Sequence, residues 1–118
     1  MREISAKDWK EFFNAFSREH EGWLVSAEVL SPEMGAQPQT SDLPFEGAIA
    51  EIRSDGSQLI ILLYGATSAS HVTHTIYAPK HIRFDEGSDS KFLQIESADN
   101  TIFILTFHRA KAAEQASK

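Results

Sequence analysis

Three histidines lie close together in the segment HVTHTIYAPKH: His71, His74 and His81. The chain of 118 residues holds five histidines and no cysteine. An imidazole can bind a metal ion or transfer a proton near neutral pH, and it can activate a neighbouring nucleophile. What this segment can do therefore depends on which of its histidines the backbone brings together.

The alternating pattern of the segment is typical of a β-strand, and it separates the first two histidines. Successive side chains of a strand point to opposite faces, so His71 and His74, three positions apart, fall on opposite sides. His74 shares its face with the apolar Val72 and Ile76. We expect His74 to be partly buried and His71 to face solvent.

Pro79 interrupts the strand before His81. A bend there would bring His71 and His81 together on the polar face. A zinc site needs three or four converging ligands, and without cysteine these would have to be His or carboxylate groups. We therefore expect no metal and no cofactor. The three histidines stay weak candidates for a small-ligand or catalytic site, with Glu46 or Asp85 as a carboxylate partner.

Residues 4–22 are predicted to form one amphipathic helix. Ser5 and Asp8 have the spacing of a capping box, and Gly22 supplies a stop. His20, near the end of the helix, is placed where the helix dipole favours a protonated imidazole. Four aromatic residues fall on one face of this helix: Trp9, Phe12, Phe13 and Phe16. Such a stripe needs a large apolar surface to pack against.

The rest of the chain has the period of two that predicts strands. The predicted strands are residues 23–30, 45–53, 58–65, 71–78, 81–85, 91–97 and 101–108. The pair 71–78 and 81–85 is either one kinked strand or two short ones. The predicted class is α+β: an N-terminal amphipathic helix packed on an antiparallel sheet of about six strands. The pattern leaves open whether this sheet curls into a small barrel.

Residues 31–44 hold three of the four prolines and few apolar side chains. This composition predicts a long loop, and long loops inside compact domains often carry function. Met34 and Leu43 are weak candidates for an apolar contact with a partner. They could equally pin the loop to the rest of the domain.

Composition limits the classes of partner. The formal net charge is -6, with seventeen acidic and eleven basic residues, and the basic residues are scattered. Binding to nucleic acid is therefore disfavoured unless the basic residues of the C-terminal half, Lys80, Arg83, Lys91 and Arg109, gather on one face. No apolar run is long enough to cross a membrane and no signal segment is evident, so a cytoplasmic protein is expected. We predict one domain over residues 1–109 and a frayed tail over residues 110–118.

Several segments together resemble a family of short bacterial proteins that is known only as a domain of unknown function. They are REISAKDWKEFFNAFSREHEGWLVSAEVL, GAQ, LPFEGAIAEI, HVTHTIYAP and LQIESADNT, and HEGWLV and HVTH are the most specific among them. The resemblance covers nearly the whole chain and implies a stand-alone bacterial domain. It implies no activity, cofactor or catalytic residue.

The leading hypothesis is a non-catalytic protein that binds itself or another protein, through a strand edge or through residues 31–44. A homodimer is expected because an open sheet has edges that can pair with a second chain. The alternative is an enzyme or small-ligand carrier that uses His71, His74 and His81. A nucleic-acid-binding barrel is a third hypothesis, which the acidic charge disfavours.

Overall fold

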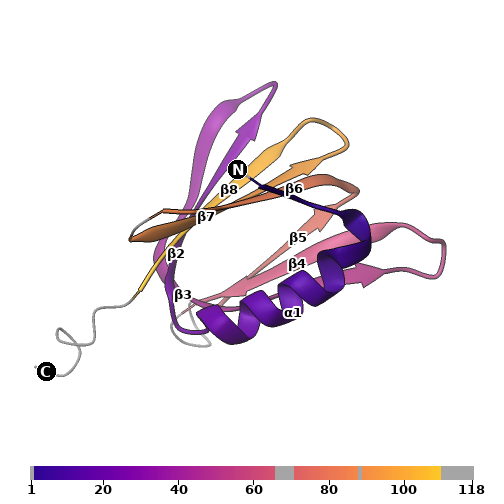
Figure 1. Ribbon diagram of the computed structural model, residues 1–118. Coiled ribbons are helices and arrows are strands. Elements are labelled where there is room, and N and C mark those ends of the chain that lie inside the picture. Colours follow the sequence, from indigo (N-terminus) through magenta and orange to yellow (C-terminus); the bar gives the residue numbers. More distant parts are fainter. Residues whose placement is uncertain (1, 66–70, 88, 110–118) are drawn as a thin grey trace, which may run out of the picture.

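The computed structural model describes residues 2–65, 71–87 and 89–109, without the side chains of residues 40 and 41. Its elements lie in the order shown in Figure 1. The helical elements are a 3-10 turn, η1 (Ala6–Asp8), and the helix α1 (Trp9–His20). The strands are β1 (Arg2–Ile4), β2 (Leu24–Ser31), β3 (Gly35–Ile52), β4 (Gln58–Tyr64), β5 (Val72–Tyr77), β6 (Pro79–Glu86), β7 (Ser90–Ser97) and β8 (Ile102–His108).

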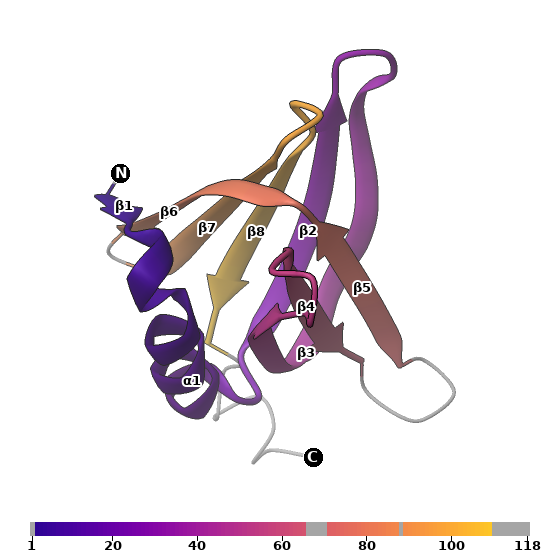
Figure 2. The same ribbon diagram turned by 90° about the vertical axis from the view of Figure 1, so that its right-hand side faces the viewer.

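The predicted α+β class is confirmed: one N-terminal helix packs on one large antiparallel sheet. In the described residues this sheet has eight strands, in the order β1-β6-β7-β8-β2-β3-β4-β5, and it is not closed into a barrel. The kinked segment around Pro79 forms two strands, because Ala78 adopts a left-handed conformation with φ of 51° between β5 and β6. Figure 2 shows the sheet curving and α1 lying across its open side.

The helix begins later than predicted. Residues 2–4 form β1, which pairs with β6 through Glu3 and Arg83 among others. Ser5 makes no side-chain cap, although its carbonyl accepts a hydrogen bond of 2.8 Å from the backbone N–H of Asp8. The ladder with β6 fixes the first residues as a strand, a long-range pairing that the local capping pattern does not contain. At the other end the helix stops beside Gly22, whose φ is +86°, as predicted.

The aromatic stripe of α1 forms the centre of the core. Phe13 is fully buried and Phe16 nearly so. The Phe16 ring lies edge-on to Phe107 of β8 at 5.0 Å and to Phe84 of β6 at 5.5 Å between ring centroids. Such edge-to-face pairs add about 0.5–1.5 kcal/mol each beyond the area they bury. The helix is thus held to strands that are distant in the sequence.

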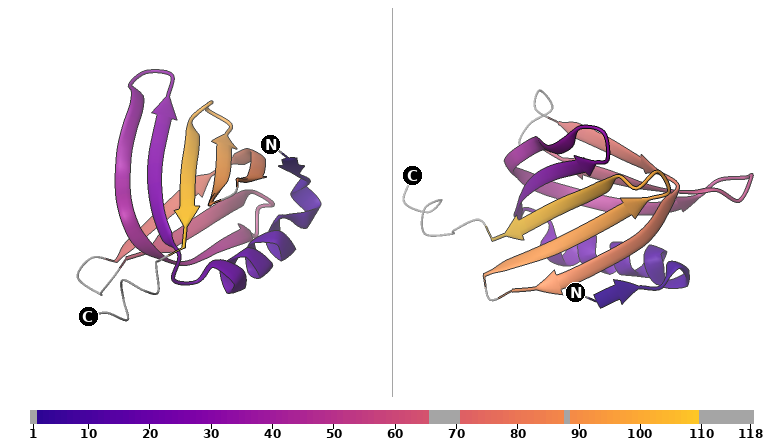
Figure 3. Two further views of the ribbon diagram at one scale, coloured as in Figure 1. Left: turned by 60° about the vertical axis from the view of Figure 1, so that its left-hand side comes forward. Right: turned by 90° about the horizontal axis from the view of Figure 1, so that it is seen from above.

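The prediction of a long loop over residues 31–44 is wrong. Residues from Gly35 onward are the first half of β3, which pairs with β2 to form a hairpin that projects from the rest of the sheet (Figure 3). Two register shifts, between Val25 and Ala27 and between Ala27 and Glu28, each place one extra residue in β3. Among the described residues, no strand pairs with the other side of this half of β3. The N–H groups that its prolines lack are therefore not needed by a neighbouring strand there.

The second half of β3 pairs with β4, so this one strand joins the β2 side of the sheet to the β4–β5 side. The β3–β4 hairpin turns at Asp55-Gly56 as predicted, with Gly56 at φ of +88°. The predicted tail over residues 110–118 lies outside the described residues. In the described part of the chain, no helix has the length and apolar character needed to span a membrane.

Candidate functional site

The strand β5 is one end of the sheet, and half of its backbone faces outward. Its register with β4 places Ile76 opposite Ile60 and His74 opposite Leu62, and the N–H of Ala78 donates to the carbonyl of Gln58 at 3.3 Å. The direction of the backbone N–H and C=O groups alternates along a strand. The backbone groups of the even-numbered residues of β5 therefore point toward β4. The N–H and C=O groups of three residues therefore point away from the sheet: Thr73, Thr75 and Tyr77.

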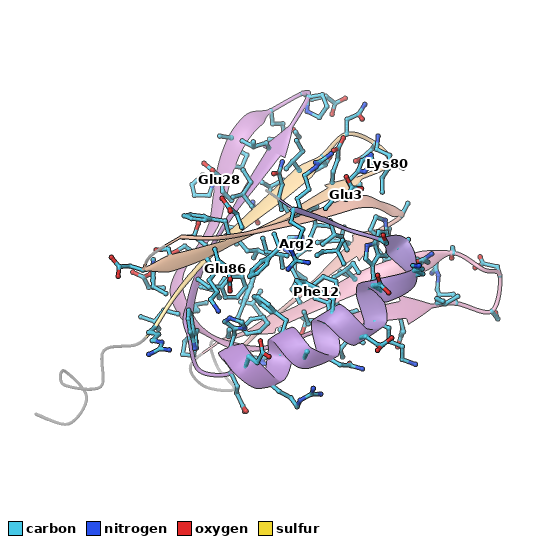
Figure 4. The ribbon with its side chains drawn as sticks, viewed as in Figure 1. Arg2, Glu3, Phe12, Glu28, Lys80 and Glu86 are labelled. Atoms are coloured by element: carbon cyan, nitrogen blue, oxygen red, sulfur yellow. The ribbon has the colours of Figure 1, made fainter. Side chains whose placement is uncertain are left out.

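This edge carries none of the usual protection. Among the described residues no strand pairs with the outer side of β5, and its sequence VTHTIY holds no Lys, Arg, Asp or Glu. Natural edge strands are usually very short, charged, or interrupted by proline or a bulge. At the other end of the sheet β1 has only three residues, and Arg2 and Glu3 are two of them (Figure 4). The two ends of the sheet therefore differ in how open they are to a second chain.

The surface beside this edge is also poor in charge. From Ala48 onward, side chains that point away from the core alternate with core residues along β3, β4 and β5, and those that are not buried are Ile49, Glu51, Ile61, Leu63, Thr73, Thr75 and Tyr77. Glu51 is the one charged residue of this set. Ile49 and Tyr77 are 42% and 59% exposed. The middle of the face is therefore apolar. Charged groups lie at its two ends, His71 with Glu46 beside Thr73 and Arg53 over the ring of Tyr77.

The structure places the first two histidines of HVTHTIYAPKH on opposite faces. His71 is exposed, and its Nδ1 lies 3.3 Å from a carboxylate oxygen of Glu46. His74 is partly buried, with its ring edge-on to Phe103 at 4.8 Å. Burial lowers the pKa of His74, because a charged imidazole would lose its hydration there.

His81 has a different partner again. Its Nδ1–H donates to the carboxylate of Glu3 at 2.6 Å, across the β1–β6 pair. Asp85 is exposed further along β6. In the part of the chain that the structure describes, no three His, Asp or Glu side chains form a group that could hold a metal ion. The bend before Pro79 therefore leaves His71 and His81 with separate carboxylate partners.

The environment of His20 differs from the one predicted from its position at the end of the helix. This side chain is only 1% exposed, and its Nδ1–H donates to the carbonyl of Phe16 at 2.8 Å. Lys91 Nζ lies 2.9 Å from Nε2 and donates to it, so the imidazole is neutral. Burial, rather than the helix dipole, dominates and lowers the pKa of His20. Its spacing from Phe16, four residues, could have indicated that it continues the buried stripe.

The apolar candidates lie at different places on the β2–β3 hairpin. Met34 is at the turn and is 68% exposed. Leu43 is partly buried and lies opposite Val25, toward the base of the hairpin. The two side chains are thus separated along the hairpin, and Met34 is the one that is accessible.

The basic residues of the C-terminal half contact carboxylates or an aromatic ring. Arg83 binds Glu96 at 3.2 Å, and Lys80 lies 3.6 Å from the same carboxylate. Lys91 lies 3.2 Å from a carboxylate oxygen of Glu86. The guanidinium of Arg109 lies over the ring of Trp23, 5.4 Å from its centroid. Neighbouring carboxylates thus offset the charge of Lys80, Arg83 and Lys91.

A comparison with protein families matches residues 1–116 to DUF5335, a family of unknown function. The chain belongs to the DUF5335 family. The resemblance seen in the sequence is therefore confirmed, and the match covers nearly the whole chain. No curated protein and no solved structure matches it. Functional assignment of this DUF5335 chain therefore depends on its own residues.

Proposed function

We propose that this DUF5335 protein acts by binding rather than by catalysis, and that it forms a homodimer through β5. The observation that carries the proposal is the open edge of β5, where three residues turn their N–H and C=O groups outward on a strand without charged side chains. Unpaired strand edges are templates for a further strand. A second copy of the chain offers an identical edge.

A twofold axis through Thr75 would pair the two strands in register. Thr75 would lie opposite Thr75 of the second copy, and Thr73 opposite Tyr77. These are all hydrogen-bonded positions, so the pairing would form about six N–H···O bonds, each with a net value of about 0.5–1.5 kcal/mol. Each copy has a net charge of -6, yet no charged side chain of β5 would face its counterpart.

Thr75→Lys tests the proposal, with Thr106→Lys as a matched control. Thr106 lies on β8, where Ser26 of β2 and Phe92 of β7 are its neighbours on the two sides. We expect the wild-type protein and Thr106→Lys to dimerise at micromolar concentration in light scattering, because both keep the β5 edge. Thr75→Lys would place two ammonium groups opposite each other at the axis and should be monomeric.

Two results would overturn the proposal: a wild-type protein that stays monomeric at high micromolar concentration, or a Thr75→Lys variant that still dimerises. Amide hydrogen exchange gives a second readout that needs no substitution. The N–H groups of Thr73, Thr75 and Tyr77 should become protected as the concentration rises. Those of His74 and Ile76, which already face β4, should be protected at every concentration.

A further inference from the structure

A groove runs between the start of the helical segment and the end of β3. Its volume is about 630 Å³, within the range of about 300–1,000 Å³ usual for binding sites. The groove is lined by Ala6, Lys7, Trp9, Lys10, Ile49, Ala50, Glu51, Ile52 and Gln58. It lies beside β3, whereas the edge proposed for dimerisation belongs to β5. We propose that this groove, called here the α1–β3 groove, binds an extended acidic segment of another protein as an added β-strand.

The hydroxyl of Ser17 shows to which side of β3 the backbone N–H and C=O groups of Ala48 point. It accepts a hydrogen bond from the N–H of Ala48 at 2.9 Å and donates one to the carbonyl of Ala48 at 3.0 Å. Both groups of Ala48 therefore face α1 and not β4. By alternation the same groups of Ala50 and Ile52 also face the helix side.

Ser17 thus forms hydrogen bonds with the outward backbone groups of β3 only at Ala48. At Ala50 and Ile52 the edge borders the α1–β3 groove, and in the described residues neither their N–H nor their C=O groups have a hydrogen-bond partner. Four backbone groups are therefore available to one extended chain. Addition of a peptide strand to a sheet edge is an established way of recognising extended segments.

The walls of the α1–β3 groove can take apolar side chains. Trp9 and Ala50 line it from α1 and β3. Ile49 and Ile52 are 42% and 72% exposed, and they are two of the four large hydrophobic residues that are exposed in the described part of the chain. Exposed apolar groups beside an open backbone edge give a peptide both hydrogen bonds and side-chain contacts.

Charge selects an acidic partner. Lys7 and Lys10 both line the groove and are exposed, and within the described residues neither forms an ion pair. Glu51 is the one acidic residue in the lining. The lining is therefore net positive in a chain whose net charge is -6. Aspartate or glutamate next to the paired segment would meet these ammonium groups.

The experiment uses two fluorescent, end-capped octapeptides. Both alternate valine and threonine, one ends in two aspartates, and the other ends in two lysines. We expect the aspartate peptide to bind the full-length protein in fluorescence polarisation, and to bind at least tenfold more tightly than the lysine peptide at low salt. Binding of the aspartate peptide should weaken as salt is added, because salt screens exposed charges.

Lys10→Glu and Arg18→Glu form the matched pair of variants. Both residues are exposed on α1, but Arg18 does not line the groove. Lys10→Glu should weaken binding of the aspartate peptide at least tenfold, and Arg18→Glu should leave it within about twofold. Methylating the peptide nitrogens that would donate to β3 should abolish binding, because a strand added at an edge is held by its backbone.

Amide exchange identifies the position of the peptide. On binding, the N–H groups of Ala50 and Ile52 should become protected, whereas those of Ile49 and Glu51 face β4 already. The inference is overturned if neither peptide binds, if both bind equally, or if protection appears only at β5. Thr75→Lys should bind the aspartate peptide like the wild type. The groove can therefore be tested whether or not the protein dimerises through β5.

Discussion

Ser17→Ala is the most direct test of how α1 is joined to β3. The substitution removes two hydrogen bonds, of 2.9 and 3.0 Å, and leaves the N–H and C=O of the buried Ala48 without partners. Each lost bond costs about 1 kcal/mol net, and stranded groups add to that cost. Alanine returns about 0.5 kcal/mol through its higher helix propensity. We therefore expect the free energy of unfolding to fall by about 2 kcal/mol.

The assays are urea unfolding for the free energy and thermal unfolding for Tm, both followed by tryptophan fluorescence, with Asn14→Ala as the control. Asn14 is exposed on the same helix, so its replacement tests helix propensity without touching β3. Ser17→Ala should lower Tm by about 8 °C, at roughly 4 °C per kcal/mol for a chain of this size. Asn14→Ala should leave Tm unchanged or raise it. A loss below about 0.5 kcal/mol for Ser17→Ala would refute the assignment of both Ala48 groups to Ser17.

Three further predictions concern the core and the end of α1. Burial lowers the pKa of His20, so the unfolded state binds more protons. The free energy of unfolding measured by urea titration should therefore fall as the pH drops below about 6.5, with a smaller slope in His20→Gln. Phe16→Ala should cost about 3–5 kcal/mol in the same titration, because a large buried ring is lost. Gly22→Ala should cost about 1 kcal/mol by thermal unfolding, because Gly22 has a φ of +86°; no measurable change would contradict this.

Much of the fold was predictable because it depends on the local periodicity of apolar and polar residues. The aromatic stripe of α1, the strand segments after it and the hairpin at Asp55-Gly56 follow from spacings of a few residues. The opposite placement of His71 and His74 follows from strand alternation in the same way. These features depend on neighbours in the sequence, and they appear in the structure where they were expected.

Features that depend on distant partners were not predictable. Proline composition indicated a loop over residues 31–44, but pairing with β2 makes most of it a strand with two bulges. The capping pattern at Ser5 gave way to the pairing of β1 with β6. His20 was placed at a helix end by its position, whereas contacts with the distant residues Phe107 and Lys91 enclose its ring.

The sequence by itself determined an acidic, cysteine-free chain with one amphipathic helix and a set of antiparallel strands. Side-chain periodicity and composition are properties of the chain alone. Only the tertiary structure decided which strand edges stay open, because an edge is defined by the absence of a neighbour and not by its own residues. The order of the strands leaves the backbone N–H and C=O groups of Thr75 pointing outward and leaves a groove beside Ala50. Both proposals follow from these two open edges.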